Sequence, residues 1–143
     1  MPTTHGTAHW QGGIKDGRGS ISTASGALSQ YPYGFASRFE GKKGSNPEEL
    51  VGAAHAACFV MALSLILGEA GLTATQLDCR ADVTIAAQDG GFTVTASRLT
   101  LTATIPGATE AVFQDCTAKA KAGCPISKLL NTEISLAASL TPS

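Results

Sequence analysis

The sequence predicts an α+β domain that occupies all of residues 1–143. Residues 46–67 form one long apolar segment with a helix-start signal, and runs before and after it have the composition of β-strands. Glycine-bearing turns separate these runs, and no repeat, low-complexity segment or linker divides the chain. A chain of 143 residues with 43% hydrophobic content is long enough to bury one core.

Charge and composition exclude several classes of function. The formal net charge of −1 gives no basic surface for nucleic acid, and no secretion signal is visible, so we expect a cytoplasmic protein. The four cysteines, at positions 58, 79, 116 and 124, lack any CxxC or Cys/His zinc spacing. We therefore expect no metal, no cofactor and no disulfide framework. In a reducing compartment such thiols are more often catalytic or redox-active than structural.

The first 45 residues predict a hairpin followed by irregular chain. Residues 7–14 and 17–23 are compatible with two strands, and the residues between them have the composition of a turn. Residues 27–41 predict a loop with a short strand, and residues 41–45 a polar loop. An aromatic cluster in this stretch is expected to fill a core or an interface rather than to stack on a ligand. Its members are Tyr31, Tyr33, Phe35 and Phe39.

The segment 46–67 has a strong helix-start signal. Asn46 can act as the N-cap, Pro47 fits the first helical position, and two glutamates place negative charge at the positive end of the helix dipole. We expect the helix to end between Gly68 and Gly71, where the second glycine suits the left-handed residue after a helix.

Apolar side chains fall on all sides of this helix, so the sequence predicts that it is buried all round. One face holds Leu50, Ala54, Cys58, Met61 and Leu65, and the opposite face holds Val60, Leu63 and Leu67. A membrane span is disfavoured, because the segment contains Gly52, His55 and Ser64 and has neither an aromatic belt nor a basic flank.

Residues 76–87 and 92–105 predict a β-hairpin with a turn at residues 88–91. The second run has a polar face whose phase slips near Arg98 and Leu99, which predicts a β-bulge there. That polar face consists of Thr93, Thr95, Ser97, Thr100, Thr102 and Thr104.

A second helix is expected over residues 109–122. Its apolar side would consist of Val112, Phe113, Cys116 and Ala120. A short helix is expected over residues 126–131, with Cys124 as its N-cap and Pro125 at its first position. Residues 132–140 predict the last strand.

Local chemistry ranks Cys124 above Cys58 as the reactive thiol. Free N–H groups and the positive dipole at a helix start lower the pKa of a thiol, whereas Cys58 lies mid-helix and needs a cation from elsewhere. Arg38 and Arg18 are the candidate cations, although a single arginine on a loop is more often solvated.

The two glutamates at the head of the long helix have different expected roles. Glu49 can close a capping box with Asn46, whereas Glu48 is free to point away and bind a guanidinium. Glu48 precedes Cys58 by about 15 Å along the helix axis, which no glutamate side chain spans. If these two residues share a site, they do so across a dimer interface.

Four segments of the chain resemble one known family: NPEELVGAAHAACFVMALS, GCPISKLL, HWQGGIKDGRGSISTASG and PYGFASRFEGKKGSNPEEL. They are similar to the osmotically inducible protein C (OsmC) branch of the OsmC/Ohr peroxidase family, over nearly the whole chain. The resemblance implies an intertwined homodimer in which long central helices pack against two antiparallel sheets. It also implies two interfacial sites that reduce organic hydroperoxides by cysteine chemistry.

The resemblance assigns roles to individual residues. Cys58 matches the peroxidatic cysteine, and Cys124, in the CPIS motif, matches the resolving cysteine. Glu48 matches the carboxylate that orients an arginine; Arg38 is the expected arginine, and Arg18 lies near the arginine position of the Ohr branch. These roles reverse the local ranking of the two thiols, because a partner arginine can outweigh a helix dipole of about 1 kcal/mol.

The implied reaction starts when the Cys58 thiolate, stabilised by Arg38, attacks the peroxide O–O bond and becomes a sulfenic acid. Cys124 condenses with it to an intramolecular disulfide, and an external thiol reductant restores both thiols. No cofactor, nucleic acid or membrane partner is expected. Apolar neighbours would favour organic peroxides over hydrogen peroxide, namely Phe39, Phe59 and Met61.

Other residues and functions have less prominent predictions. Cys79 and Cys116 are expected to be inert core thiols, and His55 a satisfied interior histidine. One alternative function is a CxxS-type thiol oxidoreductase centred on Cys124, which would keep its activity in Cys58→Ser. Another is a non-catalytic, stress-protective dimer that binds a hydrophobic ligand. A hydrolase is disfavoured, because no Ser-His-Asp pattern or nucleophile elbow is visible.

Overall fold

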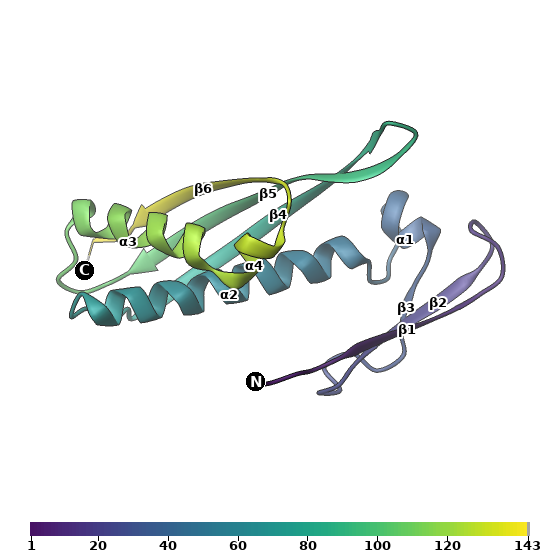
Figure 1. Cartoon of the computed structure of the whole chain (residues 1–143), viewed down its shortest axis with the longest axis horizontal. Coiled ribbons are helices and arrows are strands. Elements are labelled where there is room, and N and C mark those ends of the chain that lie inside the picture. Colours follow the sequence, from purple (N-terminus) through teal and green to yellow (C-terminus); the bar gives the residue numbers. More distant parts are fainter. Residues whose placement is uncertain (143) are drawn as a thin grey trace. The chain divides into compact units, whose positions relative to one another are not determined.

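The computed structural model describes residues 1–142, and the chain divides into two units, residues 1–50 and the chain from Val51 onward (Figure 1). The first unit contains a three-stranded sheet in the order β1-β2-β3. Strands β1 (Gly6–Gln11) and β2 (Arg18–Thr23) are antiparallel, which confirms the predicted hairpin. Strand β3 (Tyr31–Tyr33) pairs with β2 and supplies the predicted short strand.

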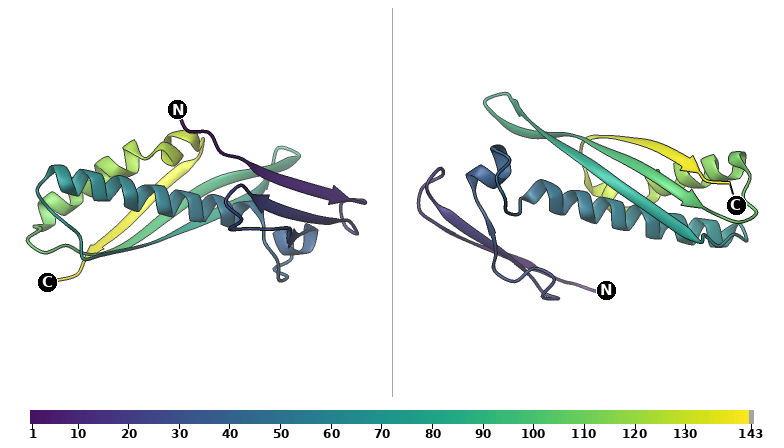
Figure 2. Two further views of the ribbon diagram at one scale, coloured as in Figure 1. Left: turned by 90° about the horizontal axis from the view of Figure 1, so that it is seen from below. Right: turned by 180° about the vertical axis from the view of Figure 1, so that it is seen from behind.

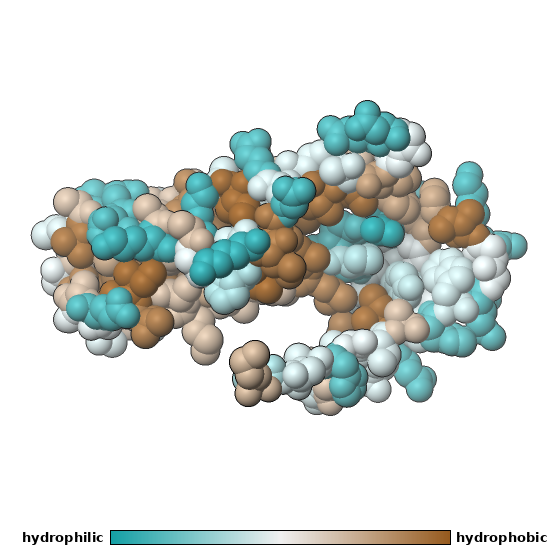
Figure 3. All heavy atoms as spheres, viewed as in Figure 1, coloured by the Kyte–Doolittle hydropathy of each residue, from teal (hydrophilic) through white to brown (hydrophobic). Residues whose placement is uncertain are grey.

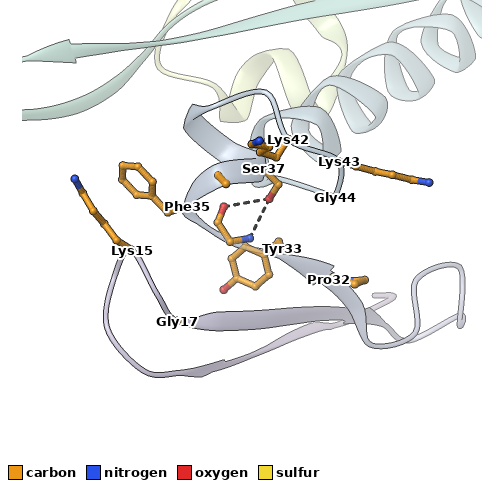
Figure 4. A pocket seen from close by; sticks show the side chains of 11 residues that line it. Lys15, Gly17, Pro32, Tyr33, Phe35, Ser37, Lys42, Lys43 and Gly44 are labelled. Carbon is orange, nitrogen blue, oxygen red and sulfur yellow. Dashed lines mark hydrogen bonds between the residues drawn. The ribbon is translucent and has the colours of Figure 1, made fainter.

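A short helix, α1 (Phe35–Phe39), follows β3 where the sequence predicts a loop. The prediction was incomplete because five residues are too few to show helical periodicity. The turn is instead stabilised by one side chain: the Ser37 hydroxyl accepts a hydrogen bond from the Gly34 N–H at 2.9 Å (Figure 4). The same hydroxyl donates to the Ser45 carbonyl oxygen at 2.9 Å, which fixes the loop before the next helix.

The long helix α2 (Pro47–Glu69) begins and ends as predicted. The Asn46 Oδ1 accepts a hydrogen bond from the Glu49 N–H at 2.8 Å, so Asn46 is the N-cap. At the other end, Gly71 is left-handed with a φ of 76°, and the Leu72 N–H donates to the Leu67 carbonyl at 2.8 Å. Together these features form a Schellman motif.

The second unit contains a sheet in the order β4-β5-β6, and helices α2 and α3 cover one of its faces (Figures 1 and 2). Strands β4 (Gln76–Gln88) and β5 (Gly91–Thr104) form the predicted hairpin, and its turn residues Asp89 and Gly90 both have positive φ, 49° and 80°. Strand β6 (Glu133–Leu140) pairs with β5 in parallel. The sheet is therefore mixed, which corrects the expectation of two antiparallel sheets, because the helices between β5 and β6 return the chain before β6 begins.

The predicted bulge exists at an earlier position. The register shifts between Thr84 and Ile85, and Thr95 on β5 is the extra residue, because Thr84 pairs with Ala96 and Ile85 with Val94. The sequence misplaced the bulge because Ser97 was assigned to the polar face. Ser97 is instead fully buried and shares the inward phase of the apolar residues that follow it on β5.

The remaining helices lie close to their predicted positions. Helix α3 spans Glu110–Gly123, and its N-cap Thr109 accepts a hydrogen bond from the Val112 N–H at 3.2 Å. Helix α4 spans Pro125–Leu129, with Cys124 at the N-cap. One side-chain prediction was wrong: Val112 is 39% exposed, and the buried face of α3 holds Thr117 beside the predicted residues. The hydroxyl of Thr117 is satisfied by the Gln114 carbonyl, so a polar residue occupies this position.

The core of the second unit lies between the helices and the inward face of β5. Its fully buried large side chains are Phe59, Leu63, Leu67, Leu99, Leu101, Ile105 and Phe113. The long helix is nevertheless buried on one side only, since Met61 is 76% exposed and Leu65 is 67% exposed. Figure 3 shows apolar atoms at the surface of this unit. The prediction of all-round burial is therefore wrong for the single chain.

Helix α2 is long and apolar enough to cross a membrane by length and composition alone. Its inner face packs against the sheet, and it includes the buried, hydrogen-bonded His55. These are the features of a core helix.

Candidate active site

Two cysteines from different helices meet in the second unit. Cys58 lies in the middle of α2, and Cys124 precedes the first residue of α4. Both are free thiols, and they lie close enough for each to shift the pKa of the other. The sequence alone could not bring these residues together, since sixty-six positions separate them. Their contact places them where a disulfide could form.

The environment of the pair favours charge on Cys124. Burial raises the pKa of the Cys58 thiol, and the hydrogen bond with Cys124 raises it further. Burial also opposes ionisation of Cys124, but it is outweighed by the Cys58 thiol, the Ser127 amide and hydroxyl and the Ile126 amide, so that the pKa of Cys124 is lowered. This agrees with the effect expected from the start of α4.

Access to solvent favours the other cysteine. Cys124 is 0% exposed, whereas Cys58 is only partly buried. Because the two thiols interact, a proton can pass between them, and accessibility then decides which sulfur meets an external oxidant. The arrangement therefore presents Cys58 to a substrate and keeps Cys124 behind it.

The first unit contains an arginine–carboxylate pair. Arg38 donates from Nε to both carboxylate oxygens of Glu48, at 3.0 and 3.3 Å, and from Nη2 to Oε1 at 2.7 Å. Glu48 is 8% exposed, so the pair is partly shielded from water. This bidentate geometry fixes the plane of the guanidinium. The structure thus joins the two residues that the sequence predicts to interact.

The local sequence explains why these two side chains meet. Arg38 lies in the last turn of α1, and Glu48 lies in the first turn of α2. The loop between them is fixed by the Ser37 contact with Ser45 and by Asn46, whose Nδ2 donates to the Ser37 carbonyl at 3.3 Å. The other candidate cation, Arg18, lies in β2, and the ion pair with Glu48 belongs to Arg38.

Three members of the aromatic cluster line a pocket beside the guanidinium, and the fourth, Tyr31, is 42% exposed. The carbon of the Arg38 guanidinium lies 5.2 Å from the centroid of the Phe39 ring, and Phe35 packs on Phe39 at 5.1 Å. The pocket has a volume of about 300 Å³ and is lined by Trp10, Ile14, Tyr33, Gly34, Phe35, Arg38 and Phe39. A neighbouring hollow, shown in Figure 4, is lined by Lys15, Lys42 and Lys43 and contains no thiol.

His55 is fully buried and hydrogen-bonded through both ring nitrogens, which confirms the prediction of a satisfied interior histidine. Its Nδ1 lies 2.7 Å from the Ser97 Oγ, and its Nε2 lies 2.8 Å from the Ser127 Oγ. Burial lowers the pKa of the imidazole. Sequence reasoning missed both serines. The available signals were the serine of CPIS and the interruption of the inward apolar phase at Ser97.

The other two cysteines have apolar or backbone surroundings. Cys116 is 3% exposed within the core, and burial raises the pKa of Cys79 to about 11 despite a hydrogen bond with the Thr100 backbone. Within residues 1–142 no group of three His, Cys, Asp or Glu side chains is placed to hold a metal ion.

Comparison with known proteins identifies the family. The model of the OsmC-like protein family matches residues 40–139, which include both cysteines of the pair and Glu48. The chain belongs to the OsmC-like family. It is 56% identical over 131 residues to the peroxiredoxin OsmC of Escherichia coli K12 and to that of Shigella flexneri, with 92% of each chain covered.

A solved structure has the same fold. The organic hydroperoxide resistance protein from Elizabethkingia anophelis superposes with a TM-score of 0.71 at 28% identity, covering 100% of this chain and 98% of that one. The α+β, OsmC-like fold predicted from the sequence is therefore confirmed.

Proposed function

We propose that this protein is a cysteine-based peroxidase that reduces organic hydroperoxides, and hydrogen peroxide more slowly, to alcohols or water. One observation supports this most strongly: the accessible Cys58 thiol contacts the buried Cys124 thiol in a chain that is 56% identical to a peroxiredoxin. When the accessible Cys58 is oxidised, the Cys124 thiol that can reduce it already lies beside it.

Cys58 is the peroxidatic residue and Cys124 the resolving residue. The Cys58 thiolate attacks the terminal peroxide oxygen; the O–O bond breaks, and the alkoxide takes a proton to become the alcohol. Cys124 then attacks the sulfur of the Cys58 sulfenic acid, forming the S–S bond and releasing water. Two equivalents of an external thiol reductant restore the dithiol.

Arg38 supplies the positive charge that the surroundings of Cys58 lack. The guanidinium stabilises the thiolate and the departing alkoxide, and Glu48 holds the guanidinium in position. The assignment rests on the family motif and on the bidentate ion pair. Glu48 and the Arg38 that it holds belong to the same chain.

The working form is a homodimer of single OsmC-like domains, each made of residues 1–143. The exposed apolar side of α2, with Met61 and Leu65, is the surface that a second copy would cover. We assign the protein to the cytoplasm, in defence against oxidative or osmotic stress. The chain has a mass of 14.5 kDa, and light scattering should give twice that mass.

Apolar groups near the site favour organic peroxides. Phe39 lines the pocket beside Arg38, and Met61 lies one turn after Cys58 on the exposed side of α2. Phe59 does not contribute, because it is fully buried in the core. Cumene hydroperoxide should be turned over faster than hydrogen peroxide, and equal rates would contradict this preference.

The decisive experiment adds one equivalent of cumene hydroperoxide to the reduced protein, blocks the remaining thiols and maps disulfides by peptide mass spectrometry. We expect a Cys58–Cys124 bond within one chain that forms in seconds and is absent from Cys58→Ser. If all four thiols stay free, the proposal fails, and a ligand-binding dimer is the better account.

A further inference from the structure

We propose that Ser127 and His55 form a proton relay that serves Cys124 during disulfide formation. This inference deepens the proposed function and rests on it, since it concerns the second chemical step. Ser127 contacts the reacting sulfur, and His55 is a positioning residue that acts through Ser127.

The geometry is a continuous line of hydrogen-bonding groups. Ser97 on β5, His55 on α2 and Ser127 on α4 are connected by contacts of 2.7 and 2.8 Å at the two ring nitrogens. Ser97 and His55 are 0% exposed and Ser127 is 9% exposed. The Ser127 hydroxyl and amide also interact with the Cys124 sulfur. Three elements far apart in the sequence therefore converge on the thiol that water does not reach.

The chemistry of a neutral imidazole restricts how this line can be arranged. One ring nitrogen donates and the other accepts. When the Nδ1–H donates to Ser97, the Nε2 accepts from the Ser127 hydroxyl, whose oxygen can then accept the Cys124 S–H. Proton transfer along this line places the thiol proton on His55 and leaves a Cys124 thiolate. Both N–H groups of the resulting imidazolium donate to serine oxygens, so the charged ring has partners on both sides.

The proton balance closes at the second step. The Cys124 thiolate attacks the Cys58 sulfenic sulfur, the S–O bond breaks, and the departing hydroxide needs one proton. His55 returns the proton that it took from Cys124, so the sum is one thiol and one sulfenic acid giving one disulfide and one water. Because burial disfavours the charged imidazole, the ring gives the proton back readily.

Two thiols lie on the elements that hold His55 and Ser127. Cys58 lies three residues further along α2, and Cys124 lies beyond Ser127. The charged residues next to the relevant positions of β5, α4 and β6 are Arg98, Lys128 and Glu133, and all three are exposed. The pH dependence of the second step should therefore report on the imidazole and the two thiols.

The test separates the two chemical steps in full-length reduced protein. After one equivalent of cumene hydroperoxide is mixed in, peroxide loss measures the first step, and acid-quenched disulfide content measures the second. We expect Ser127→Ala and His55→Gln to slow disulfide formation about tenfold or more, and to slow it more than peroxide reduction. Ser127→Thr, which keeps a hydroxyl, should restore most of the rate. Ser139→Ala, an exposed serine on β6, is the matched control.

The pH profile distinguishes a relay from simple packing. In the wild type, the second step should slow as the pH falls through the lowered pKa of His55, and this inflection should be absent from His55→Gln. Ser97→Ala leaves the contacts of Cys124 intact and should slow the step about threefold. It provides a second test if His55→Gln disturbs folding. Wild-type rates and an unchanged inflection in Ser127→Ala and Ser97→Ala would overturn the relay. Failure of the wild type to reduce peroxide would overturn the proposed function instead.

Discussion

The second unit contains two kinds of cysteine environment, and burial does not separate them. Cys124 is 0% exposed and Cys116 is 3% exposed, and the pKa of the buried Cys124 is lowered. The difference lies in the neighbours: Cys124 faces a second thiol, a hydroxyl and helix-start amides, whereas Cys116 packs among apolar side chains. Cys79, with a pKa near 11, has only the Thr100 backbone to oppose burial. The neighbours of Cys124, rather than its burial, therefore account for its lowered pKa.

The largest effect should come from removing the thiol of Cys58. Cys58→Ser should reduce peroxidase activity by more than about 100-fold, because the serine hydroxyl is not ionised at neutral pH and cannot attack the O–O bond. Cys79→Ser, a matched change in the same unit, should stay within about twofold of the wild type. Steady-state reduction of cumene hydroperoxide with dithiothreitol measures both.

This pair of variants also tests the alternative centred on Cys124. A CxxS-type oxidoreductase would keep its activity in Cys58→Ser. The complete burial of Cys124 argues against that outcome, since a substrate must reach the sulfur that it oxidises. Equal losses in Cys58→Ser and Cys79→Ser would mean that the two environments do not differ in function.

A second prediction concerns the ion pair. Glu48→Gln removes the charge that holds Arg38, and we expect a fall in activity of about 10- to 100-fold from the loss of guanidinium position. Glu49→Gln is the ideal comparison, because Glu49 is the next residue, is exposed, and contributes its N–H rather than its carboxylate to the helix cap. Its activity should be unchanged, and similar losses in both variants would assign the effect to the helix start instead.

Much of the fold was predictable because its signals are local. The caps of α2 at Asn46 and Gly71, the hairpin turn at Asp89 and Gly90, and the helix start at Cys124 and Pro125 each depend on a few adjacent residues. The helix position of Glu48 predicted a free carboxylate, whereas the choice of Arg38 over Arg18 as its partner came from the family resemblance.

The failures have a common physical cause in tertiary contacts. Ser97 was assigned to the polar face because its buried partner, His55, is distant in sequence, and this moved the predicted bulge. The contact between Cys58 and Cys124 was not a failure, but it was expected only from the family resemblance, because it depends on α4 packing against α2, which no local pattern encodes. The exposed side of α2 was predicted to be buried because composition alone does not distinguish a fully buried helix from one with an exposed apolar side.

The smallest predicted effect is the pH dependence of stability that the buried His55, hydrogen-bonded to Ser127 beside Cys124, imposes on the folded chain. The pKa of His55 is lowered in the folded chain, so below about pH 6.5 the unfolded chain binds more protons than the folded one. Stability is therefore fully present above that pH and falls as the pH drops, by at most about 1.4 kcal/mol per pH unit. Urea unfolding between about pH 7.5 and 5.5 measures the slope while most carboxylates stay ionised.

The control for this slope is a histidine outside the network. His55→Gln should lower stability near neutral pH, because two buried serines lose their partner, but it should flatten the acid slope. His9→Gln, on the exposed strand β1, should keep the slope of the wild type. If His9→Gln flattens the slope and His55→Gln does not, the acid sensitivity arises outside the site. The buried imidazole of His55 would then not be the cause of the loss of stability at low pH.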